Sequence, residues 1–184
     1  KEKPYPIKMM FFQRANPILS WADTNKLKKA LNKLDFMVVH DLFMTETAEL
    51  ADVVLPATAW AETDGTFVNT ERRVQRVREA VPPPGQAKPD WWIVAQIAQR
   101  LGFPGFDWNH AGEVFDEACS LMPIYNGLSW DRISRGPGLN WPVPSSDHPG
   151  TPFLHKGRFP AKDGMGRFKA LEYKLPAEQA DDEP

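Results

Sequence analysis

The sequence predicts an α/β fold, in which a doubly wound, mainly parallel sheet precedes a helical stretch and an irregular tail rich in proline and glycine. Three short apolar runs, residues 7–12, 36–40 and 52–55, have the length of strands. They are continuous rather than alternating, which is typical of strands buried on both faces. Helical spacing between them gives strand, helix, strand, helix and strand over about fifty residues, and this order favours a parallel sheet with covering helices.

The helices are predicted from their caps and their apolar spacing. Asp23 can cap a helix over residues 25–34, in which leucine and alanine recur at helical spacing. Gly102 supplies a stop signal for a helix that begins near Asp90 and ends at Leu101. Two further helices are predicted over residues 46–51 and 113–121.

The composition changes after Val81, where the run PPPG forms a stiff, extended connector. Residues 136–160 are rich in proline, glycine and tryptophan, which predicts irregular chain that wraps over a larger body. We therefore expect three parts. They are an α/β core (1–81), a proline-rich connector with helices packing on that core (82–135), and an irregular wrapping tail (136–184).

Length, charge and cysteine content exclude several classes of protein. A chain of 184 residues can bury a good core, and a net charge of −2 argues against a nucleic-acid binder. Cys119 is the single cysteine, so an internal disulfide and a cysteine-ligated iron–sulfur cluster are both excluded. No run approaches the roughly 20 apolar residues that span a bilayer. The four histidines show no metal-ligand spacing, so we expect no metal site.

Polar residues follow each predicted strand, at the edge where doubly wound sheets bind ligands. The first strand leads to Asn16, the second ends at His40 and Asp41, and the third leads past Pro56 to Thr63. A carboxylate at the end of the second strand suits a ribose or a base edge. The first strand lacks the G-x-G-x-x-G loop, so the fold is predicted to be Rossmann-like without being an ordinary NAD-binding domain.

The segment after the third strand has an unusual composition. Gly65 occurs where a turn would need a positive φ, and the run GTFVNTERRVQ then brings several arginines together between residues 72 and 78. A strand end, a polar loop and an arginine cluster in this order suggest a site for a phosphorylated, polar ligand. The alternative interpretation of the arginines is a solvated strand face.

Several blocks together resemble a known family. They are HDLFMTETAELADVVLP, GTFVNTERRVQ, PPPGQAKPDWWIVAQIAQRLG and GLNWPVP, and with their surroundings they cover residues 16–175. They are similar to the third domain of molybdenum or tungsten oxidoreductases that carry bis(molybdopterin guanine dinucleotide), above all formate dehydrogenase catalytic subunits. The resemblance implies a fragment of a larger enzyme that oxidises formate to carbon dioxide, and it implies that this fragment alone is inactive.

The resemblance also implies a cofactor-binding role for particular residues. Asn16, His40, Asp41, Thr63 and Asp90 would hold one guanine dinucleotide arm of the pterin cofactor. Asp90 is the residue expected at the guanine edge, because its carboxylate can accept from both N1–H and the exocyclic amine, a pair that adenine lacks. No catalytic residue and no metal ligand is expected within the chain.

The chain departs from the family pattern at two positions. Relatives commonly have glycine where Arg14 stands, and glycine permits a closer backbone approach. Lysine or histidine is frequent at the position of Thr63. Simpler interpretations also remain open: Asp90 as a helix N-cap, Asp41 as a cap or turn residue, and His40 as an ordinary loop histidine.

The resemblance places the remaining chemistry outside this chain. The metal, molybdenum or tungsten, and the iron–sulfur cluster of such enzymes need cysteine or selenocysteine ligands that are missing here. The implied partners are sister domains of the same polypeptide and electron-transfer subunits, and NAD-linked relatives suggest the cytoplasm. Three alternatives remain: a nitrate reductase, the large iron–sulfur subunit of respiratory complex I, and a free-standing interaction module that docks through its tail.

Overall fold

The computed structural model describes residues 4–175, and these divide into two units that meet at Thr151 and Pro152. Every helix and strand among the described residues lies in the first unit. The described part of the second unit, residues 152–175, consists of turns, bends and extended chain. The boundaries predicted after residues 81 and 135 stay predictions.

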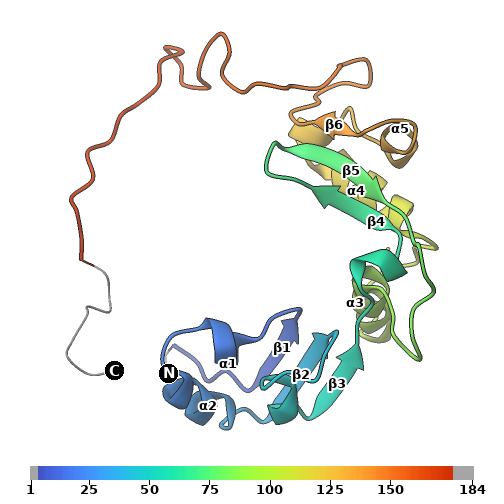
Figure 1. Cartoon of the computed structure of the whole chain (residues 1–184), viewed down its shortest axis with the longest axis vertical. Coiled ribbons are helices and arrows are strands. Elements are labelled where there is room, and N and C mark those ends of the chain that lie inside the picture. Colours follow the sequence, from blue (N-terminus) through green and yellow to red (C-terminus); the bar gives the residue numbers. More distant parts are fainter. Residues whose placement is uncertain (1–3, 176–184) are drawn as a thin grey trace. The chain divides into compact units, whose positions relative to one another are not determined.

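The first sheet is parallel, as predicted, and its strand order is β1-β2-β3 (Figure 1). Its strands are β1 (Met9–Gln13), β2 (Phe36–Asp41) and β3 (Val53–Pro56). The register pairs Gln13 with His40 and His40 with Leu55, so all three strands end at the same edge. The α/β fold class is confirmed. The carboxyl ends of β1–β3 are called the carboxyl edge below.

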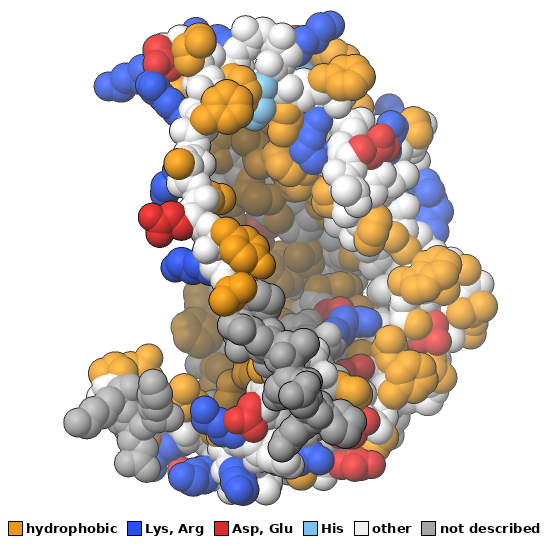
Figure 2. All heavy atoms as spheres, turned by 60° about the vertical axis from the view of Figure 1, so that its left-hand side comes forward, with side chains coloured by type: hydrophobic (Ala, Val, Ile, Leu, Met, Phe, Trp, Pro, Cys, Tyr) orange, Lys and Arg blue, Asp and Glu red, His pale blue; other side chains and the backbone are white. Residues whose placement is uncertain are grey.

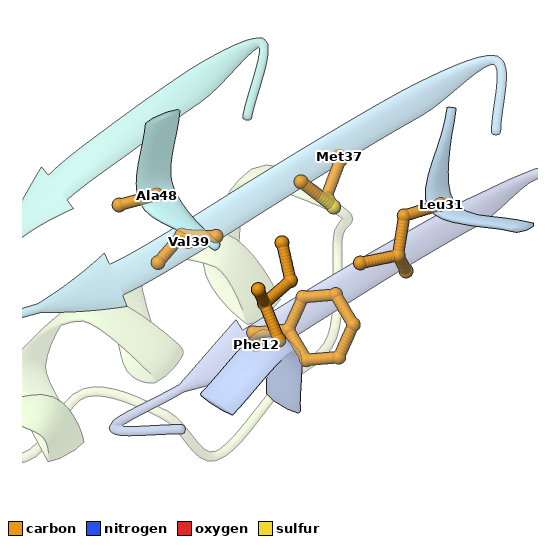
Figure 3. Close-up of a cluster of buried hydrophobic side chains, with 6 residues drawn as sticks. Phe12, Leu31, Met37, Val39 and Ala48 are labelled. Atoms are coloured by element: carbon orange, nitrogen blue, oxygen red, sulfur yellow. The ribbon is translucent and has the colours of Figure 1, made fainter. Parts of the chain in front are cut away.

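Short helices cover the first sheet and close its core. They are α1 (Pro17–Ser20), α2 (Thr24–Leu31) and the 3₁₀ turn η1 (Ala48–Leu50). Phe12 from β1, Met37 and Val39 from β2, Leu31 from α2 and Ala48 from η1 pack together with Ile18 (Figure 3). Fully burying one large apolar side chain contributes about 1.5–3 kcal/mol, so this cluster holds the carboxyl edge in place.

The predicted elements of the first sheet need small corrections. Asp23 caps α2 as expected, since its side chain accepts from Lys26 N at 3.0 Å, but the helix ends at Leu31. The helix predicted over residues 46–51 is only the turn η1. Burial on both faces is incomplete, because Met9 and Phe36 at the amino ends of their strands are 54% and 41% exposed.

A second sheet, which is antiparallel, was not predicted from the sequence. It contains β4 (Gly65–Val68), β5 (Arg73–Val77) and the two-residue strand β6 (Leu139–Asn140). Gly65 lies in β4 and has no positive φ, so the turn expected there is wrong. The run 65–77 forms a hairpin, because Thr66 pairs with Arg76 and Val68 with Val74 across antiparallel strands.

Three helices follow the connector, and the last two, α4 (Ala111–Leu121) and α5 (Trp130–Ser134), pack against the second sheet. Gly102, at φ +81°, ends α3 (Asp90–Arg100) as predicted. Helices α4 and α5 supply a second core, and η2 (Trp60–Glu62) and η3 (Pro123–Tyr125) are single 3₁₀ turns. The buried members of the second core are Val74, Phe115, Cys119, Leu128, Ile133 and Val143.

Cys119 is a buried structural thiol in α4, as predicted, with 3% of its surface exposed. Desolvation, with a smaller contribution from the charge of Asp116, raises the pKa of this thiol to about 11. The thiol is therefore protonated at neutral pH and has little reactivity.

Large apolar side chains remain on the surface of the first unit, and Figure 2 shows such side chains among the lysines and arginines of one face. Trp60 and Phe43 are 77% and 76% exposed, and Leu19 and Met44 are exposed to a similar extent. This much apolar surface is typical of a face that other protein covers. No helix among residues 4–175 has the length and apolar character that crossing a membrane requires.

Candidate functional site

The most unusual residue of the first sheet is His40, which β2 carries to the carboxyl edge. Its neighbours Gln13 and Leu55 flank it in the register, and its side chain is fully buried. Neither ring nitrogen makes a well-aligned hydrogen bond among the described residues, although the Lys88 backbone lies close enough to the ring to oppose the lowering of the His40 pKa. A buried polar group without a partner costs about 1–3 kcal/mol, so it indicates either strain or a missing ligand.

Asp90 lies beside this histidine. The His40 Nδ1 atom is 3.3 Å from Asp90 Oδ1, but the two atoms are not aligned for a hydrogen bond, so Oδ1 also lacks a partner. Asp90 is the first residue of α3, and the N-cap is Pro89. The N-cap interpretation of Asp90 is therefore wrong, although its carboxylate still lies at the positive end of the helix dipole.

Arg14 completes the cluster. Its Nε atom is 2.5 Å from Asp90 Oδ2, and its Nη2 atom donates to the backbone oxygen of Thr58 at 2.5 Å. The four residues come from the ends of β1 and β2, the loop after β3 and the first turn of α3. They are called the edge cluster below: Arg14, His40, Thr58 and Asp90.

The backbone of Arg14 has an uncommon conformation. Its φ is +50°, in the left-handed region, while its N–H donates to His40 O at 2.8 Å. A non-glycine residue pays about 1–2 kcal/mol for this conformation, and glycine adopts it freely. The glycine expected here from the family pattern is thus explained by backbone geometry, and the chain tolerates arginine at this position at a cost in strain.

Burial sets the protonation of His40. Desolvation lowers the pKa of His40 below its ordinary value, because the charged imidazolium is disfavoured in a buried position. The negative charge of Asp90 opposes this shift, and the positive charge of Arg14 adds to it. The imidazole is consequently neutral at pH 7, with one nitrogen as a donor and the other as an acceptor.

Asn16 and Asp41 lie where β1 and β2 end, but their side chains have other partners than the edge cluster. Asn16 donates to Glu46 Oε2 at 2.8 Å and accepts from Thr47 Oγ1 at 2.7 Å. Asp41 Oδ1 accepts from Leu42 N at 2.7 Å, which is a turn contact rather than a helix cap.

Thr63 follows η2 and donates to the oxygen of its neighbour Asp64 at 3.1 Å. Among the five predicted residues, His40 and Asp90 are thus distant in sequence and brought together by the fold, with Asp41 next to His40 in the chain.

Two threonines of the site were missed from the sequence. Thr58 is fully buried, and its Oγ1 atom has no hydrogen-bond partner among the described residues. Thr47 is also fully buried. Its hydroxyl accepts from Ile18 N at 3.3 Å and donates to Asn16 Oδ1, so it connects these two residues. A threonine within two residues of a strand-ending proline was a usable signal for Thr58, whereas Thr47 follows only from the fold.

The arginine cluster of the second sheet has a different role. Arg76 donates to Ser134 Oγ and Asp64 Oδ1 at 3.1 and 3.3 Å, and its guanidinium lies 4.4 Å from the ring centre of Trp130. Arg78 donates to the backbone oxygen of Ser134 at 2.9 Å. Arg72 donates to the backbone oxygens of Trp141 and Thr151. These arginines join distant segments of the chain.

Within residues 4–175, no group of three histidine, cysteine, aspartate or glutamate side chains is arranged to hold a metal ion. The chemistry available at the carboxyl edge is instead that of hydrogen bonding. A neutral imidazole, a carboxylate oxygen and a hydroxyl, all without partners, can together recognise a polar ring or sugar.

Comparison with known proteins identifies relatives along most of the chain. It is 47% identical over 178 residues to the F420-dependent formate dehydrogenase 2 subunit alpha of Methanococcus maripaludis, which covers 96% of this chain and 26% of that protein. It is 46% identical over 176 residues to the F420-dependent formate dehydrogenase subunit alpha of Methanocaldococcus jannaschii, with 95% and 26% covered. The chain therefore spans about a quarter of the length of these curated relatives.

A solved structure and a family profile agree with these relatives. The acetylene hydratase of Pelobacter acetylenicus superposes with a TM-score of 0.62 at 30% identity, over 73% of this chain and 18% of that one. The profile of the family described as "Molybdopterin oxidoreductase" matches residues 1–100, which include the parallel sheet and all of α3. The chain belongs to the molybdopterin oxidoreductase family.

Proposed function

We propose that this chain is part of a formate dehydrogenase and that its carboxyl edge holds the guanine dinucleotide arm of the molybdopterin cofactor. The relatives support the first half of this proposal, since both are formate dehydrogenase alpha subunits. The observation that supports the second half is the pair of His40 and Asp90, whose facing polar atoms are buried and without partners.

The residues present fit a guanine ring. Asp90 Oδ2 is bonded to Arg14 and Oδ1 is buried beside His40, so the carboxylate would turn away from His40 in order to accept from guanine N1–H and the exocyclic amine. The neutral imidazole of His40 adds a donor and an acceptor, and the hydroxyl of Thr58 adds another pair. Adenine offers no matching pair of donors on one edge, so the site would favour guanine.

The three remaining predicted residues would extend the site from the base toward the sugar and phosphates. Asp41 can accept from a ribose hydroxyl, because its one described bond engages only Oδ1. Asn16 and Thr63 would have to exchange their present bonds to Thr47 and Asp64 for bonds to the ligand. We therefore assign the tightest contacts to His40, Asp41 and Asp90, and weaker ones to Asn16 and Thr63.

When bound, the cofactor supplies the molybdenum or tungsten centre at which formate is oxidised to carbon dioxide. The residues of this chain bind and orient the nucleotide arm and take no part in the redox step. The chain alone is accordingly expected to be inactive. The iron–sulfur cluster and the protein ligand of the metal would come from other parts of the polypeptide.

The exposed apolar side chains support a role inside a larger protein. Trp60, Phe43 and Leu19 would be covered by sister domains of the same polypeptide, and electron-transfer subunits would complete the enzyme. A cytoplasmic location of the full-length enzyme is part of this proposal.

A nucleotide titration tests the binding role. The isotopically labelled 184-residue chain is titrated with GDP and with ADP while amide and imidazole NMR signals are followed. We expect GDP to shift the signals of His40 and Asp41, and to bind at least about 10-fold more tightly than ADP. Asp90→Asn should weaken GDP binding by about 30-fold, because it removes one charge-assisted acceptor and places an NH₂ group against the guanine donors.

The matched control is Asp35→Asn, since Asp35 is exposed, lies before β2 and pairs only with Lys8. This variant should bind GDP like the unmodified chain. Equal responses to GDP and ADP, or no response at His40 and Asp41, would contradict the binding role.

An activity assay tests the reaction. The natural full-length protein should oxidise formate, and it should not reduce nitrate. The likeness to an acetylene hydratase shows why this assay is needed, because one fold carries different reactions. A full-length protein with nitrate reductase activity, or with neither activity, would contradict the assignment of substrate.

A further inference from the structure

We propose that a groove between α2 and the chain leading into β1 is a docking site for an acidic segment of a second protein, one that presents apolar side chains between its carboxylates. The groove lies at the amino ends of the strands, because Lys8 and Asp35, directly before β1 and β2, both line it. The carboxyl edge lies at the other ends of the same strands, so this inference goes beyond the proposed function and does not depend on nucleotide binding. The groove is called the lysine groove below.

The floor of the lysine groove is apolar and open to solvent. Ile7 and Trp21 are 56% and 54% exposed, and Met10 and Leu34 are half-buried beside them. The groove has a volume of about 1010 Å³, which is room for several side chains. Since Met10 and Leu34 also pack against the buried cluster shown in Figure 3, the floor is anchored to the fold and can receive apolar side chains without rearrangement.

Lysines form the rim of this groove. Lys26 and Lys29 come from α2, Lys33 follows the helix and Lys8 precedes β1, and all four are exposed. Among the described residues, Asp35 is the only acidic side chain that lines the groove, and it pairs with Lys8 at 3.5 Å. The local charge is therefore +3, in a chain whose net charge is −2. Such a local excess of one sign attracts a partner surface of the opposite sign.

The combination of an apolar floor and a charged rim favours a partner that arrives by diffusion. Attraction between opposite charges speeds the encounter, and a rim that stays hydrated loses little solvation when the apolar centre is covered. A sister domain packed permanently over the groove would instead have to desolvate the lysine ammonium groups, which is costly unless each of them is paired. The lysine groove is therefore assigned to a second protein rather than to the rest of the same polypeptide.

The packing of α2 argues against a membrane surface as the occupant. A helix that lies on a bilayer inserts its apolar face among the lipids. The apolar side of α2 is instead turned toward the core, where Leu31 is buried and Leu27 packs against the same cluster. The lysines thus surround a hollow, and a hollow fits the protruding side chains of a peptide segment.

The experiment titrates the isotopically labelled 184-residue chain with a synthetic peptide of roughly 11 residues, enough for three helical turns, that carries leucine on one face and glutamate on the other. We expect the amide signals of Ile7, Lys29 and Ala30 to shift, with a dissociation constant on the order of 10 μM at low salt. A peptide with glutamine in place of glutamate should bind at least about 10-fold more weakly. Raising the salt concentration to roughly 0.5 M should weaken the glutamate peptide to a similar extent.

Charge reversal at one lysine of the rim is the decisive variant. Lys29→Glu should weaken binding of the glutamate peptide by about 10-fold, because it replaces an attraction by a repulsion. The matched control is Lys28→Glu, since Lys28 is exposed in the same last turn of α2 but does not line the groove. Both variants change the net charge and the interaction with the helix dipole alike, so Lys28→Glu should change the dissociation constant by less than about 2-fold.

Two further variants test the floor and the sign of the charge effect. Ile7→Ser should weaken peptide binding by about 5-fold, because an apolar contact with the leucine face is lost. Asp35→Asn removes the acidic side chain of the groove and frees Lys8, so it should tighten binding by about 2-fold. Both positions are exposed, so the melting temperatures of these variants should change little.

Each contrary outcome overturns the proposal in a recognisable way. No shift at Ile7, Lys29 and Ala30, or equal losses in Lys29→Glu and Lys28→Glu, would mean that the groove does not recognise the peptide. Vesicles of phosphatidylserine that shift these signals where the peptide does not would assign the groove to a membrane. In the natural full-length protein, Lys29 should undergo reductive methylation by formaldehyde as readily as Lys28, and protection of Lys29 alone would assign the groove to a sister domain.

Discussion

At the carboxyl edge of β1–β3, a fully buried histidine has both ring nitrogens without partners, whereas around β4–β6 the arginines bond to the chain's own oxygens and aromatic rings. Both regions were candidates for ligand binding from their sequence. The difference shows that the arginines of such a segment can have a purely structural role and join parts of a fold. A site is better indicated by polar atoms that the fold buries and leaves unpaired.

The contrast is one of degree, because single atoms in the second region also lack partners. Arg76 Nε and Trp141 Nε1 are buried and unpaired. Each, however, belongs to a side chain with other interactions: Arg76 makes two hydrogen bonds, and Trp141 lies against Tyr125 and Arg72. A whole imidazole ring without a hydrogen bond is a stronger indication of a ligand.

The largest effect is expected from a backbone change in the second region. Gly138 has φ +86°, and an added Cβ would lie 2.1 Å from Val74 O. Gly138→Ala should lower the free energy of unfolding by about 4 kcal/mol, from backbone strain and forced displacement of β5 together. Denaturant unfolding measures this.

Gly136→Ala is the control for this change. Gly136 has open space around it and no positive φ, so its replacement should change the free energy of unfolding by less than about 0.5 kcal/mol. Equal losses in both variants would mean that β5 and β6 do not meet as described.

An intermediate effect is expected from a structural arginine. Arg132 donates to the backbone oxygens of Gly127, Ser145 and His148. Arg132→Met should cost about 2–3 kcal/mol of stability, because it leaves several carbonyls without their charged donor. The dissociation constant of GDP at the carboxyl edge should not change. A GDP titration under conditions in which the variant is folded checks this.

The control is Arg135→Met in the neighbouring turn. Arg135 pairs only with Asp131 on the surface, where its side chain is 76% exposed, so its loss should cost less than about 0.5 kcal/mol. A loss of GDP selectivity in Arg132→Met would break the distinction between the two regions.

The smallest effect is expected from the titration of His40. Its pKa in the folded state is lowered by burial from the ordinary value of 6.5, so the unfolded chain binds more protons as the solution becomes acidic. The contribution of His40 is complete above about pH 6.5 and is lost as the pH falls through the folded pKa. The free energy of unfolding should thus decrease from pH 7 to pH 5, and this decrease should be smaller in His40→Gln.

Two comparisons make this pH measurement specific. The carboxyl groups of Glu46, Glu71 and Glu113 have pKa values lowered from 4.5, so they lose stability at more acidic pH. The unmodified chain keeps the same carboxyl groups as His40→Gln, so the difference between their slopes from pH 7 to pH 5 isolates the contribution of His40. An unchanged slope in His40→Gln would contradict a buried neutral imidazole.

The first sheet could be predicted from the sequence because its signals are local. Residues 36–39 form an apolar run that is followed by the polar residues His40 and Asp41, and β2 spans Phe36–Asp41. The start of α2 at the Asp23 cap and the end of α3 at Gly102 are likewise predicted from a few neighbouring residues. The addition of β6 to the second sheet could not be predicted, because β6 has only two residues and its partner β5 lies far away in the sequence.

The candidate site was predicted residue by residue but not as a cluster. The family pattern selected Asp90, and its contact with His40 depends on the Ala57–Lys88 bridge, which brings the start of α3 to the end of β3. Arg14 was noted only as a departure from glycine. Its contacts require a left-handed backbone conformation, which cannot be predicted from the sequence because arginine rarely adopts that conformation.

The long reach of β5 to β6 has a consequence for how the chain is made. The strands of the first sheet are complete at Pro56, so this region can assemble while the ribosome is still adding the rest. Arg73 pairs with Asn140, which is made 67 residues later, and at about 5–20 residues per second this takes roughly 3 to 13 seconds. During that interval β4 and β5 stand as a hairpin with an open edge, which makes this stage of synthesis the one most in need of a chaperone.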